Sequence, residues 1–584
     1  LGQFIKVVEG LLPFIASENQ DVPKASLAFV MLPGFLNWLT HSPPAHLSVR
    51  TFLDAARLTP PKDLADFILQ STSNLYHFYS RRMSRAASNK SYQQQAASTG
   101  NSRKRENFLK KVTKLCQDNR FSLAMSLVER MASDDSDLPP PPPLDSAEDQ
   151  AKFLSESLHA LNPPATHNDD LSVFEDQVNE STALRVSGEL FKGILEGAPK
   201  GSAPGAMGWT FRLIQQMVRG HPDPAIFCEK IVLYLINPML AGKLNCQLWT
   251  TSRAVLIPKK SPGWRPLAIG DAWYRLMART AMRACGVDVG KKLRPQQLGC
   301  GTRGGAEIAA RIAQLVVDEA QENFRDTVII SFDIKNAFGT MPRRFMMEGI
   351  LKHYPGLAKF FSWAYGGTGI LVDNDRIQVA SNATGCRQGD PLAGLCFCLG
   401  LQEVLEEGLT ELCKEVMMLD GQHQAHLRRF AGLAELLDKD PSSLPLKLLA
   451  SAIHGFLTFM DDLFFMTHSK YARKIILGVA GILKGYGLIV QVTKTTVKIC
   501  DRGADFNPAD ISDLNVSVVW PEECTEILGV PVGDRMACRR WLCHALEKKI
   551  LPVARGLRGL NPAAAFNLLR YCLNTKAGYW TRVL

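Results

Sequence analysis

Two adjacent aspartates between two apolar runs constrain the fold of this chain more than any other feature. The segment from Phe456 to Met466 reads Phe-Leu-Thr-Phe-Met-Asp-Asp-Leu-Phe-Phe-Met, with Asp461 and Asp462 at its centre. Each flank has the aromatic, apolar character of a buried strand, and Asp is a common turn residue, so the segment predicts a tight β-hairpin. A solvated surface turn is the alternative. In an apolar surround, however, two like charges are costly unless a cation binds between them, and a divalent metal ion is the natural one.

A third carboxylate follows a second apolar strand. Residues 326–338 read Asp-Thr-Val-Ile-Ile-Ser-Phe-Asp-Ile-Lys-Asn-Ala-Phe, and the apolar run ends at Asp333. A single Asp at the end of a strand is most often a helix cap. Two apolar strands that bring three carboxylates to one edge are instead what two-metal phosphoryl transfer requires, because both ions contact the attacking and leaving oxygens.

The string Phe459-Met460-Asp461-Asp462 resembles the catalytic signature of reverse transcriptases, in which an aromatic or apolar residue and any residue precede Asp-Asp. The resemblance implies an α+β right-hand polymerase with fingers, palm and part of a thumb. It also implies that Asp333, Asp461 and Asp462 bind two Mg²⁺ ions, with Mn²⁺ as the alternative metal.

The segment before the first aspartate resembles the fingers of the same family. A Gly/Pro loop at 198–209 is similar to the one in LINE-type, non-LTR reverse transcriptases, and a strand over 254–260 and a turn at 264–267 lead into a helix over 271–285. By resemblance, Arg265 and Lys259 bind the triphosphate of the incoming nucleotide. Arg suits this role because its planar fork contacts two oxygens at once. Ordinary surface charge is the alternative for both residues.

Further family strings follow in the family order. A glycine-rich segment containing Arg303 opens a helix over 306–322 and is a candidate nucleic-acid contact, although a plain helix entry explains it nearly as well. Phe338 is five residues after Asp333, where the resemblance implies an aromatic ring that excludes a 2′-hydroxyl and so selects dNTPs. Gln388 and Gly389 open the string Gln-Gly-Asp-Pro-Leu, the most specific in the chain, and are expected to position the nascent base pair.

The last matching strings lie after the Asp-Asp hairpin. A glycine turn and an expected strand lead to Lys494, which by resemblance protonates the pyrophosphate leaving group, although a lysine at a strand end has the same pattern. Residues 526–533 resemble the primer-gripping hairpin of the family, with Gly529 as a nucleic-acid contact. A basic helical segment follows and predicts the start of a thumb.

Charge divides the N-terminal third of the chain. Residues 81–120 contain 11 Lys or Arg and 2 acids, whereas residues 134–180 contain 12 acids and one Lys, with an uninterrupted proline run at 139–143. This composition predicts a flexible basic arm and an acidic, stiff linker. The basic arm could contact nucleic-acid phosphates, act as a nuclear-import patch or be a solvated linker.

We therefore divide the chain into seven predicted segments. They are a helical N-terminal region (1–80), a disordered basic and then acidic linker (81–170), an N-terminal extension of the polymerase (171–250), fingers and palm (251–409), a helical insertion (410–450), the rest of the palm (451–535) and the start of a thumb (536–584). No signal peptide or membrane segment is expected, and both ends suggest a piece of a longer protein.

The predicted function is RNA-directed DNA synthesis, with template RNA, primer DNA and dNTPs as partners and an intracellular, nuclear location. An RNA-dependent RNA polymerase or an intron maturase is one alternative, and a non-catalytic nucleic-acid-binding module derived from a reverse transcriptase is another. Phe338 argues against RNA synthesis. The oligomeric state has no signature in the sequence.

Overall fold

A computed structural model describes residues 2–15, 101–117, 121–132, 147–244, 247–258, 264–323, 326–373, 377–419, 455–502 and 506–583, together with positions 29, 32 and 52. The proline run at 139–143, the basic residues at 81–100, Lys259 and most of the expected insertion at 410–450 lie outside these ranges. Among the described helices, none has both the length and the apolar character needed to cross a bilayer.

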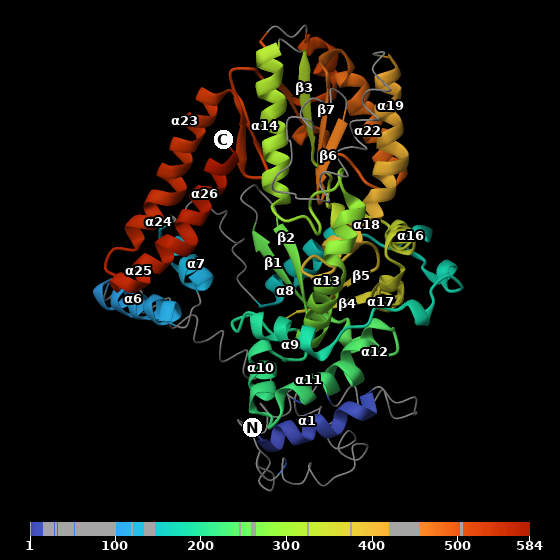
Figure 1. The fold of residues 1–584 in the computed structure, drawn as a ribbon, viewed down its shortest axis with the longest axis vertical. Coiled ribbons are helices and arrows are strands. Elements are labelled where there is room, and N and C mark those ends of the chain that lie inside the picture. The colour runs from blue at the N-terminus through green and yellow to red at the C-terminus, as the bar shows by residue number, and fades with distance from the viewer. Residues whose placement is uncertain are drawn as a thin grey trace.

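A five-stranded sheet forms the centre of the upper half of the molecule (Figure 1). Its strands lie in the order β6 (Gly455–Phe459), β7 (Asp462–His468), β3 (Thr327–Phe332), β8 (Thr496–Ile499) and β9 (Ser517–Val519). All neighbours are antiparallel except β8 and β9. The predicted hairpin is confirmed, because β6 pairs with β7 in the register that places Phe459 opposite Asp462.

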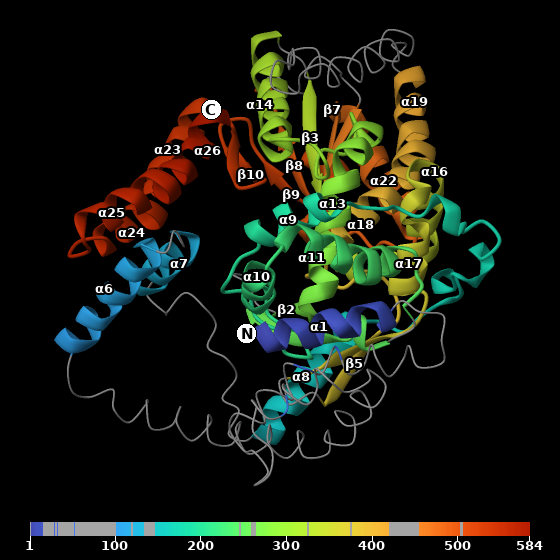
Figure 2. The same cartoon turned by 60° about the horizontal axis from the view of Figure 1, so that its bottom comes forward.

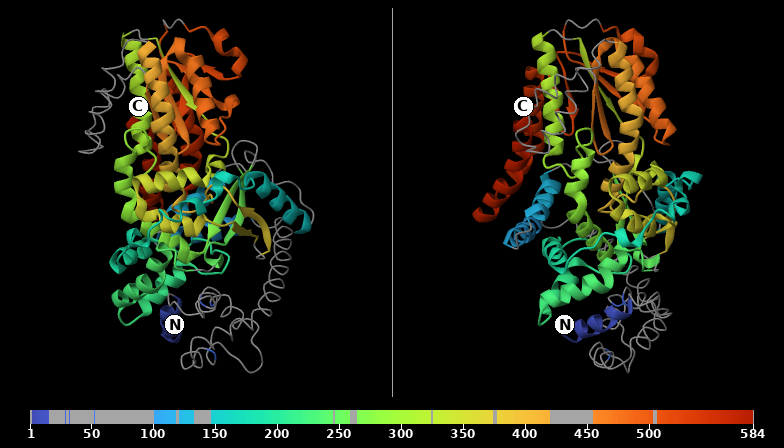
Figure 3. Two further views of the ribbon diagram at one scale, coloured as in Figure 1. Left: turned by 90° about the vertical axis from the view of Figure 1, so that its right-hand side faces the viewer. Right: turned by 45° about the vertical axis from the view of Figure 1, so that its right-hand side comes forward.

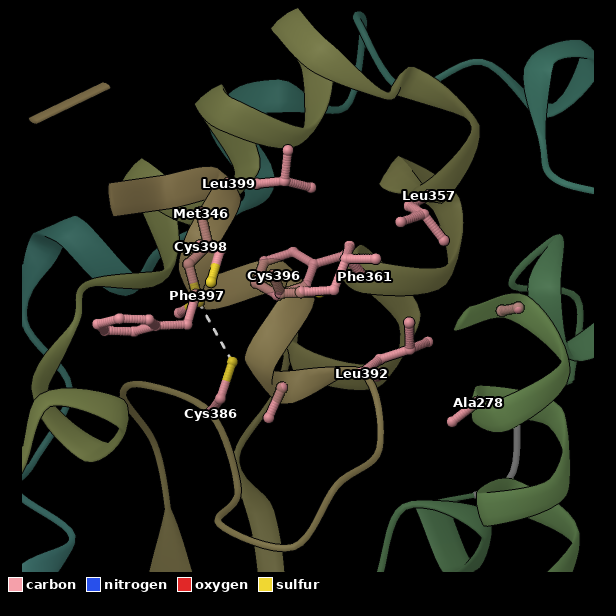
Figure 4. Close-up of a cluster of buried hydrophobic side chains, with 14 of the residues drawn as sticks. Ala278, Met346, Leu357, Phe361, Cys386, Leu392, Cys396, Phe397, Cys398 and Leu399 are labelled. Carbon is pink, nitrogen blue, oxygen red and sulfur yellow. Dashed lines mark hydrogen bonds between the residues drawn. The ribbon is translucent and has the colours of Figure 1, made fainter. Parts of the chain in front are cut away.

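Alternating side chains of β3 cover both faces of this sheet, as expected for a strand with period two. Ile329 packs with α14 (Gly305–Asn323) on one face, whereas Val328 and Ile330 belong to the main core on the other. The helices of that second face include α18 (Ala393–Glu403) and α22 (Ala472–Gly485). Figure 3 shows the sheet between α14 and α22. Figure 4 shows the apolar side chains around α18, including Phe397 and Leu392.

A second sheet of four strands lies below the first (Figure 1). Its order is β2 (Trp264–Gly270), β1 (Ser252–Pro258), β4 (Gly369–Val372) and β5 (Gln378–Asn382). Asp271 caps the helix that follows β2, α13 (Ala272–Leu293), by accepting a hydrogen bond from the Trp273 amide. The helix is longer than the expected 271–285 because its buried side continues to Leu293.

Further helices pack around these sheets or lie near the N-terminus. They are α1 (Gly2–Ile15), α9 (Gly188–Gly197), α10 (Phe211–Gly220), α11 (Pro224–Ile231), α12 (Asn237–Leu240), α15 (Ala337–Thr340), α16 (Arg343–His353) and α17 (Ala358–Tyr365). Helix α1 belongs to the main core, where the ring of its residue Phe4 lies beside the ring of Trp209.

The predicted thumb region consists of α23 (Arg535–Ala545), α24 (Leu551–Gly556), α25 (Pro562–Leu568) and α26 (Asn574–Val583). The predicted primer-gripping hairpin is present as β10 (Cys524–Ile527) and β11 (Val530–Gly533). Tyr579 of α26 donates a 2.8 Å hydrogen bond to the Leu528 carbonyl in the turn of this hairpin, so the last helix is tied to it.

The prediction of a flexible basic arm is wrong for residues 101–132, which form α6 (Asn101–Gln117) and α7 (Phe121–Ala132). Their apolar faces pack against the thumb helices, with Val112 and Leu115 in one buried cluster with Leu557 and Leu568. Figures 1 and 2 show both helices beside α24 and α25. The many lysines and arginines of α6 concealed this apolar face in the composition, but not in the spacing of residues 108, 112 and 115.

The prediction of an unstructured acidic linker is wrong for residues 147–170. They contain α8 (Ala147–Leu161) and a short 3₁₀ turn at His167–Asp169. Leu158 of α8 is buried against β1, β2, β4 and β5, and Ser155 donates a 2.8 Å hydrogen bond to the Val379 carbonyl. This helix is therefore part of the polymerase body.

Two smaller expectations also differ. Helix α18 does not end near Glu406, because π-helical residues Val404–Leu409 carry it into α19 (Thr410–Leu419), so the start of the expected insertion continues the palm helix. Val490 makes one isolated β-bridge, to Ile334, but the expected strand is not present directly before Lys494. That residue ends a 3₁₀ turn, and β8 begins only at Thr496.

Candidate active site

The Asp-Asp turn is strained and clamped. Met460, directly before Asp461, has a φ of +57°, a left-handed conformation that non-glycine residues seldom adopt. The side chain of Gln297 holds the Met460 backbone from both sides: its Oε1 accepts from the Met460 N–H at 2.8 Å and its Nε2 donates to the Met460 carbonyl at 3.0 Å. Gln297 is fully buried. The turn therefore has one defined shape, which fixes the positions of both aspartates.

The third aspartate meets this turn through the strand register. In the pairing of β3 with β7, Phe332 lies opposite Leu463, so one further step brings Asp333 opposite Asp462. The backbone after β3 is also fixed from the other side, because the Gln491 amide donates a 2.7 Å hydrogen bond to the Asp333 carbonyl. The structure thus brings Asp333, Asp461 and Asp462 to one edge of the sheet, as the sequence predicts.

Burial and the neighbouring carboxylates shift the pKa values of the two hairpin aspartates. The pKa of Asp462 is raised to about 6, first by burial and then by the like charges of Asp461 and Asp333, although the residue keeps solvent-exposed surface. Burial and Asp333 also raise the pKa of Asp461, and Arg265 opposes that rise. The Nζ of Lys494 lies 3.3 Å from Asp333 Oδ2 and partly neutralises the group.

These carboxylates fit divalent metal ions. Burial and the like charges of neighbouring carboxylates raise the pKa values of Asp461 and Asp462, and a bound cation would offset both effects. Their oxygens are more widely spread than in a compact cage: among the described residues, the one trio with ligand atoms within 4.8 Å of one another is His353, Glu403 and Glu406. That trio is already neutralised by Lys352, whose Nζ lies 3.1 Å from Glu403 and 3.0 Å from Glu406.

A cavity of about 560 Å³ lies beside the carboxylates. Its lining combines residues predicted from distant parts of the sequence: Arg265, Asp333, Phe338, Gln388, Asp461 and Lys494. A volume of this size accommodates a drug-sized ligand. Two of the three carboxylates (Asp333 and Asp461), the Arg265 guanidinium and the Phe338 ring therefore face one space large enough for a nucleotide.

Phe338 is held within this lining. Its ring lies 4.6 Å from that of Phe397 on α18, and its carbonyl accepts a 2.7 Å hydrogen bond from the Cys386 amide. The residue is only partly buried, so part of it remains available to the cavity. It is therefore both a core residue and a cavity residue, and its expected contact with the sugar stays a prediction.

Gln388 and Gly389 lie against the strand that carries Arg265. The Gln388 carbonyl accepts a 2.7 Å hydrogen bond from Ala268 in β2. Gly389 has a φ of +112°, and a Cβ there would lie 2.8 Å from the Ala268 carbonyl oxygen, so this position requires glycine. Asp390 does not cap α18 from the adjacent position, because the helix begins three residues later. It caps the turn instead, by accepting from Leu392 N at 2.9 Å.

A buried network beneath this loop was not predicted. Asp390 Oδ2 accepts hydrogen bonds from the hydroxyls of Tyr274 and Tyr365, the latter at 2.6 Å, and lies 3.5 Å from the Arg387 guanidinium. Arg387 also donates to the Tyr274 hydroxyl at 3.0 Å and stacks over the Tyr365 ring. The network fixes the loop that carries Gln388. No sequence pattern indicated a role for Tyr365, because it lies 25 residues before its hydrogen-bond partner Asp390.

Among the predicted residues that the structure describes, four are not in the cavity lining: Asp462, Gly389, Arg303 and Gly529. Arg303 is exposed just before α14, and Gly529 lies in the β10–β11 turn with a φ of +82° and open space around it. Lys259 lies outside the described residues. Part of the predicted linker lines the cavity instead: Leu158, Ala160, Leu161, Asn162 and Pro163.

The palm sheet brings three carboxylates to one edge, strand β2 of the predicted fingers carries Arg265, and a loop that requires Gly389 packs against that strand. This combination defines a polymerase of the right-hand class. Residues 257–532 match the family model described as "Reverse transcriptase (RNA-dependent DNA polymerase)". This part of the chain is therefore a reverse transcriptase domain by its match to that family model.

Two curated relatives belong to mobile elements. The "Retrotransposable element SLACS 132 kDa protein" of Trypanosoma brucei gambiense is 26% identical over 245 residues, which is 41% of this chain and 19% of the relative. The "Retrovirus-related Pol polyprotein from type-2 retrotransposable element R2DM" of Drosophila melanogaster is 26% identical over 226 residues, or 37% of this chain and 20% of the relative. Each match thus spans about a fifth of the relative's length.

Proposed function

We propose that this chain is an RNA-directed DNA polymerase that adds dNTPs to a primer 3′-hydroxyl. The observation that carries the proposal is the shared cavity, in which Asp333 and Asp461 face Arg265, Phe338 and Gln388. Each residue type has one task in nucleotidyl transfer, and each was expected from a different part of the sequence.

Asp333, Asp461 and Asp462 would hold two Mg²⁺ ions, whose charge when bound activates the primer hydroxyl and stabilises the pyrophosphate leaving group. Arg265 would bind the triphosphate, because a guanidinium forms paired hydrogen bonds with phosphate oxygens. Gln388 and Gly389, fixed on β2, would position the nascent base pair, and Phe338 would exclude a 2′-hydroxyl. Lys494, now 3.3 Å from Asp333, is the candidate proton donor to the leaving group.

Template RNA and primer DNA are the proposed partners. The segment 535–583, α23 to α26 with the turns between them, contains 10 Lys or Arg and a single acid, Glu547. Such a charge balance suits phosphate backbones, whose binding depends on Lys and Arg and is screened by salt.

An intracellular, nuclear location is proposed on two grounds. The 13 described cysteines are all unpaired, which suits a reducing compartment. The basic segment at 81–120 suits nuclear import. Imaging of a tagged chain with and without residues 81–100 would test it, and unchanged distribution would contradict the import role.

The proposed activity is tested by primer extension on an RNA template with Mg²⁺, with dNTPs and rNTPs in separate reactions. DNA product with dNTPs and little product with rNTPs is expected. RNA product alone would favour the RNA polymerase alternative. Salt-sensitive template binding without any extension would favour a non-catalytic binding module.

A further inference from the structure

The end of helix α8 forms a wall of the nucleotide cavity. Leu158, Leu161, Asn162 and Pro163 line the same space as Asp333 and Phe338, although they precede the matched family segment by about 100 residues. Leu158 is buried among β1, β2, β4 and β5, so this wall is anchored in the body of the protein.

One side chain joins this wall to the loop that carries Phe338. The Nδ2 of Asn336 donates a 2.8 Å hydrogen bond to the Leu161 carbonyl, across 175 residues of sequence. Asn336 has a φ of +50°, and its side chain makes no capping bond to α15, the helix that contains Phe338. The amide also lies against Gly339, where an added Cβ would be 2.7 Å from Nδ2.

The loop is fixed on its other sides as well. Lys335 N donates to the Ile489 carbonyl at 2.8 Å, and Cys386 N donates to the Phe338 carbonyl at 2.7 Å. The Asn336 bond is a direct link between the loop that carries Phe338 and the α8 wall. On the α8 side, Asn162 accepts a 3.3 Å hydrogen bond from Asn382 of β5 and donates to the Leu158 carbonyl at 2.8 Å.

We propose that the C-terminal end of α8 and Asn336 form a sugar-selecting element, in which the Asn336–Leu161 bond positions Phe338 against the ribose of the incoming nucleotide. The inference rests on the proposed polymerase function and extends it to residues outside the family match. Asn336 is a positioning residue, because it acts through Phe338. A gap of even about 1 Å between ring and sugar would admit a 2′-hydroxyl, since small misplacements have large effects on reacting geometry.

The test compares the two substrates within each preparation of the full chain. The ratio of kcat/KM for dGTP to that for GTP, opposite a template C, is measured for wild type and for Asn336→Gly. Glycine keeps the left-handed backbone and removes only the side chain. Because both substrates meet the same protein sample, partial unfolding cancels from the ratio. We expect the ratio to fall about tenfold or more.

Three further variants show whether a change in the ratio comes from the Asn336 side chain. Asn515→Gly makes the same change at the other described asparagine with such a backbone, φ +52°, in an exposed turn outside the cavity lining, and should keep the wild-type ratio. Asn162→Ala loosens the wall from the α8 side and should lower the ratio. Phe338→Ala should lower it most.

A binding readout accompanies the kinetics: retention of a dideoxy-terminated primer–template complex by dGTP or by GTP, which should lose its preference for dGTP in Asn336→Gly. A wild-type ratio in Asn336→Gly beside a lowered ratio in Phe338→Ala would overturn the inference and leave the proposed function standing. If wild type itself made no DNA, the proposed function would fail first.

Discussion

Gln297 and Met460 form a two-way hydrogen-bonded pair directly before the Asp-Asp turn. The Gln297 side chain accepts from the Met460 amide and donates to the Met460 carbonyl, and its Oε1 also accepts from Gly299 N at 2.8 Å. Met460 is held at a positive φ by this clamp. The position of both aspartates in space thus depends on a glutamine 163 residues away.

Gln297→Met should therefore reduce catalysis far more than it reduces folding. The methionine fills a similar volume but leaves the Met460 N–H and C=O without partners, which costs about 1–3 kcal/mol per buried group. We expect kcat to fall about 100-fold, with a higher Mg²⁺ requirement, because a shifted turn misplaces the carboxylates.

The control is Gln314→Met. Gln314 clamps Gly533 of the β10–β11 hairpin in the same two-way manner, at 3.0 and 3.1 Å. It should lose similar thermal stability and weaken primer binding, while its Mg²⁺ requirement stays at the wild-type value. Equal Mg²⁺ curves for the two variants would contradict the role assigned to Gln297.

Tyr365→Phe should raise the KM for dNTPs. The change removes a 2.6 Å hydrogen bond to buried Asp390, and a bond to a charged group contributes about 1.5–3 kcal/mol. The loop with Gln388 then loses part of its support. We expect a KM increase of about tenfold in steady-state extension, with a smaller change in kcat. Tyr579→Phe, which removes a 2.8 Å bond at the β10–β11 turn, should leave the dNTP KM unchanged. A raised KM in both variants, or in neither, would argue against the network.

Asp462→Asn should stabilise the metal-free protein much more at pH 8 than at pH 4. The folded-state pKa of about 6 lies above the value of about 3.9 expected in the unfolded chain, so the folded state binds this proton more tightly. Ionisation of this carboxyl group therefore lowers the stability of the folded state as pH rises from about 4 to about 6, and the neutral amide removes that penalty. Thermal unfolding in EDTA should show a gain of about 1–4 °C at pH 8.

Adding Mg²⁺ should reverse this order at pH 8, because bound metal stabilises the wild type and the amide weakens the site. Asp288→Asn, an exposed change on α13, serves as the control. If the Asp462→Asn gain were the same at pH 4 and pH 8, the electrostatic explanation would be refuted.

Leu115→Ala should loosen the thumb region. Leu115 of α6 is buried with Leu557 and Leu568, and truncation of a buried leucine costs about 2–5 kcal/mol. We expect shorter extension products and faster proteolysis within 535–583, with little change in single-nucleotide addition. The exposed neighbour Lys114→Ala should keep product length at low salt. Wild-type product lengths for Leu115→Ala would show that the packing of α6 on the thumb has no role in synthesis.

The sequence predicted those parts of the site in which local pattern and chemistry agree. The two apolar flanks of Asp461 and the apolar run before Asp333 are typical of buried strands, and an aspartate at the end of each run is what predicted the site. Contacts between polar residues far apart leave no such pattern: Gln297, Tyr365 and Asn336 find partners 163, 25 and 175 residues away. The α8 helix was missed for a different reason. Its buried face depends on Leu154 and Leu158 within an acidic segment, and composition outweighed that short spacing.

The most direct test of the metal-dependent polymerase site is a single-turnover extension assay with Asp461→Asn, beside Asp288→Asn and wild type. Each protein is given an RNA template, a DNA primer, dNTPs and Mg²⁺, and primer–template binding is measured in the same samples. We predict that Asp461→Asn binds the primer–template normally and extends it at least about 1,000-fold more slowly, because an amide is a poor ligand for Mg²⁺. Extension by Asp461→Asn at near the wild-type rate would contradict the placement of the active site at this hairpin.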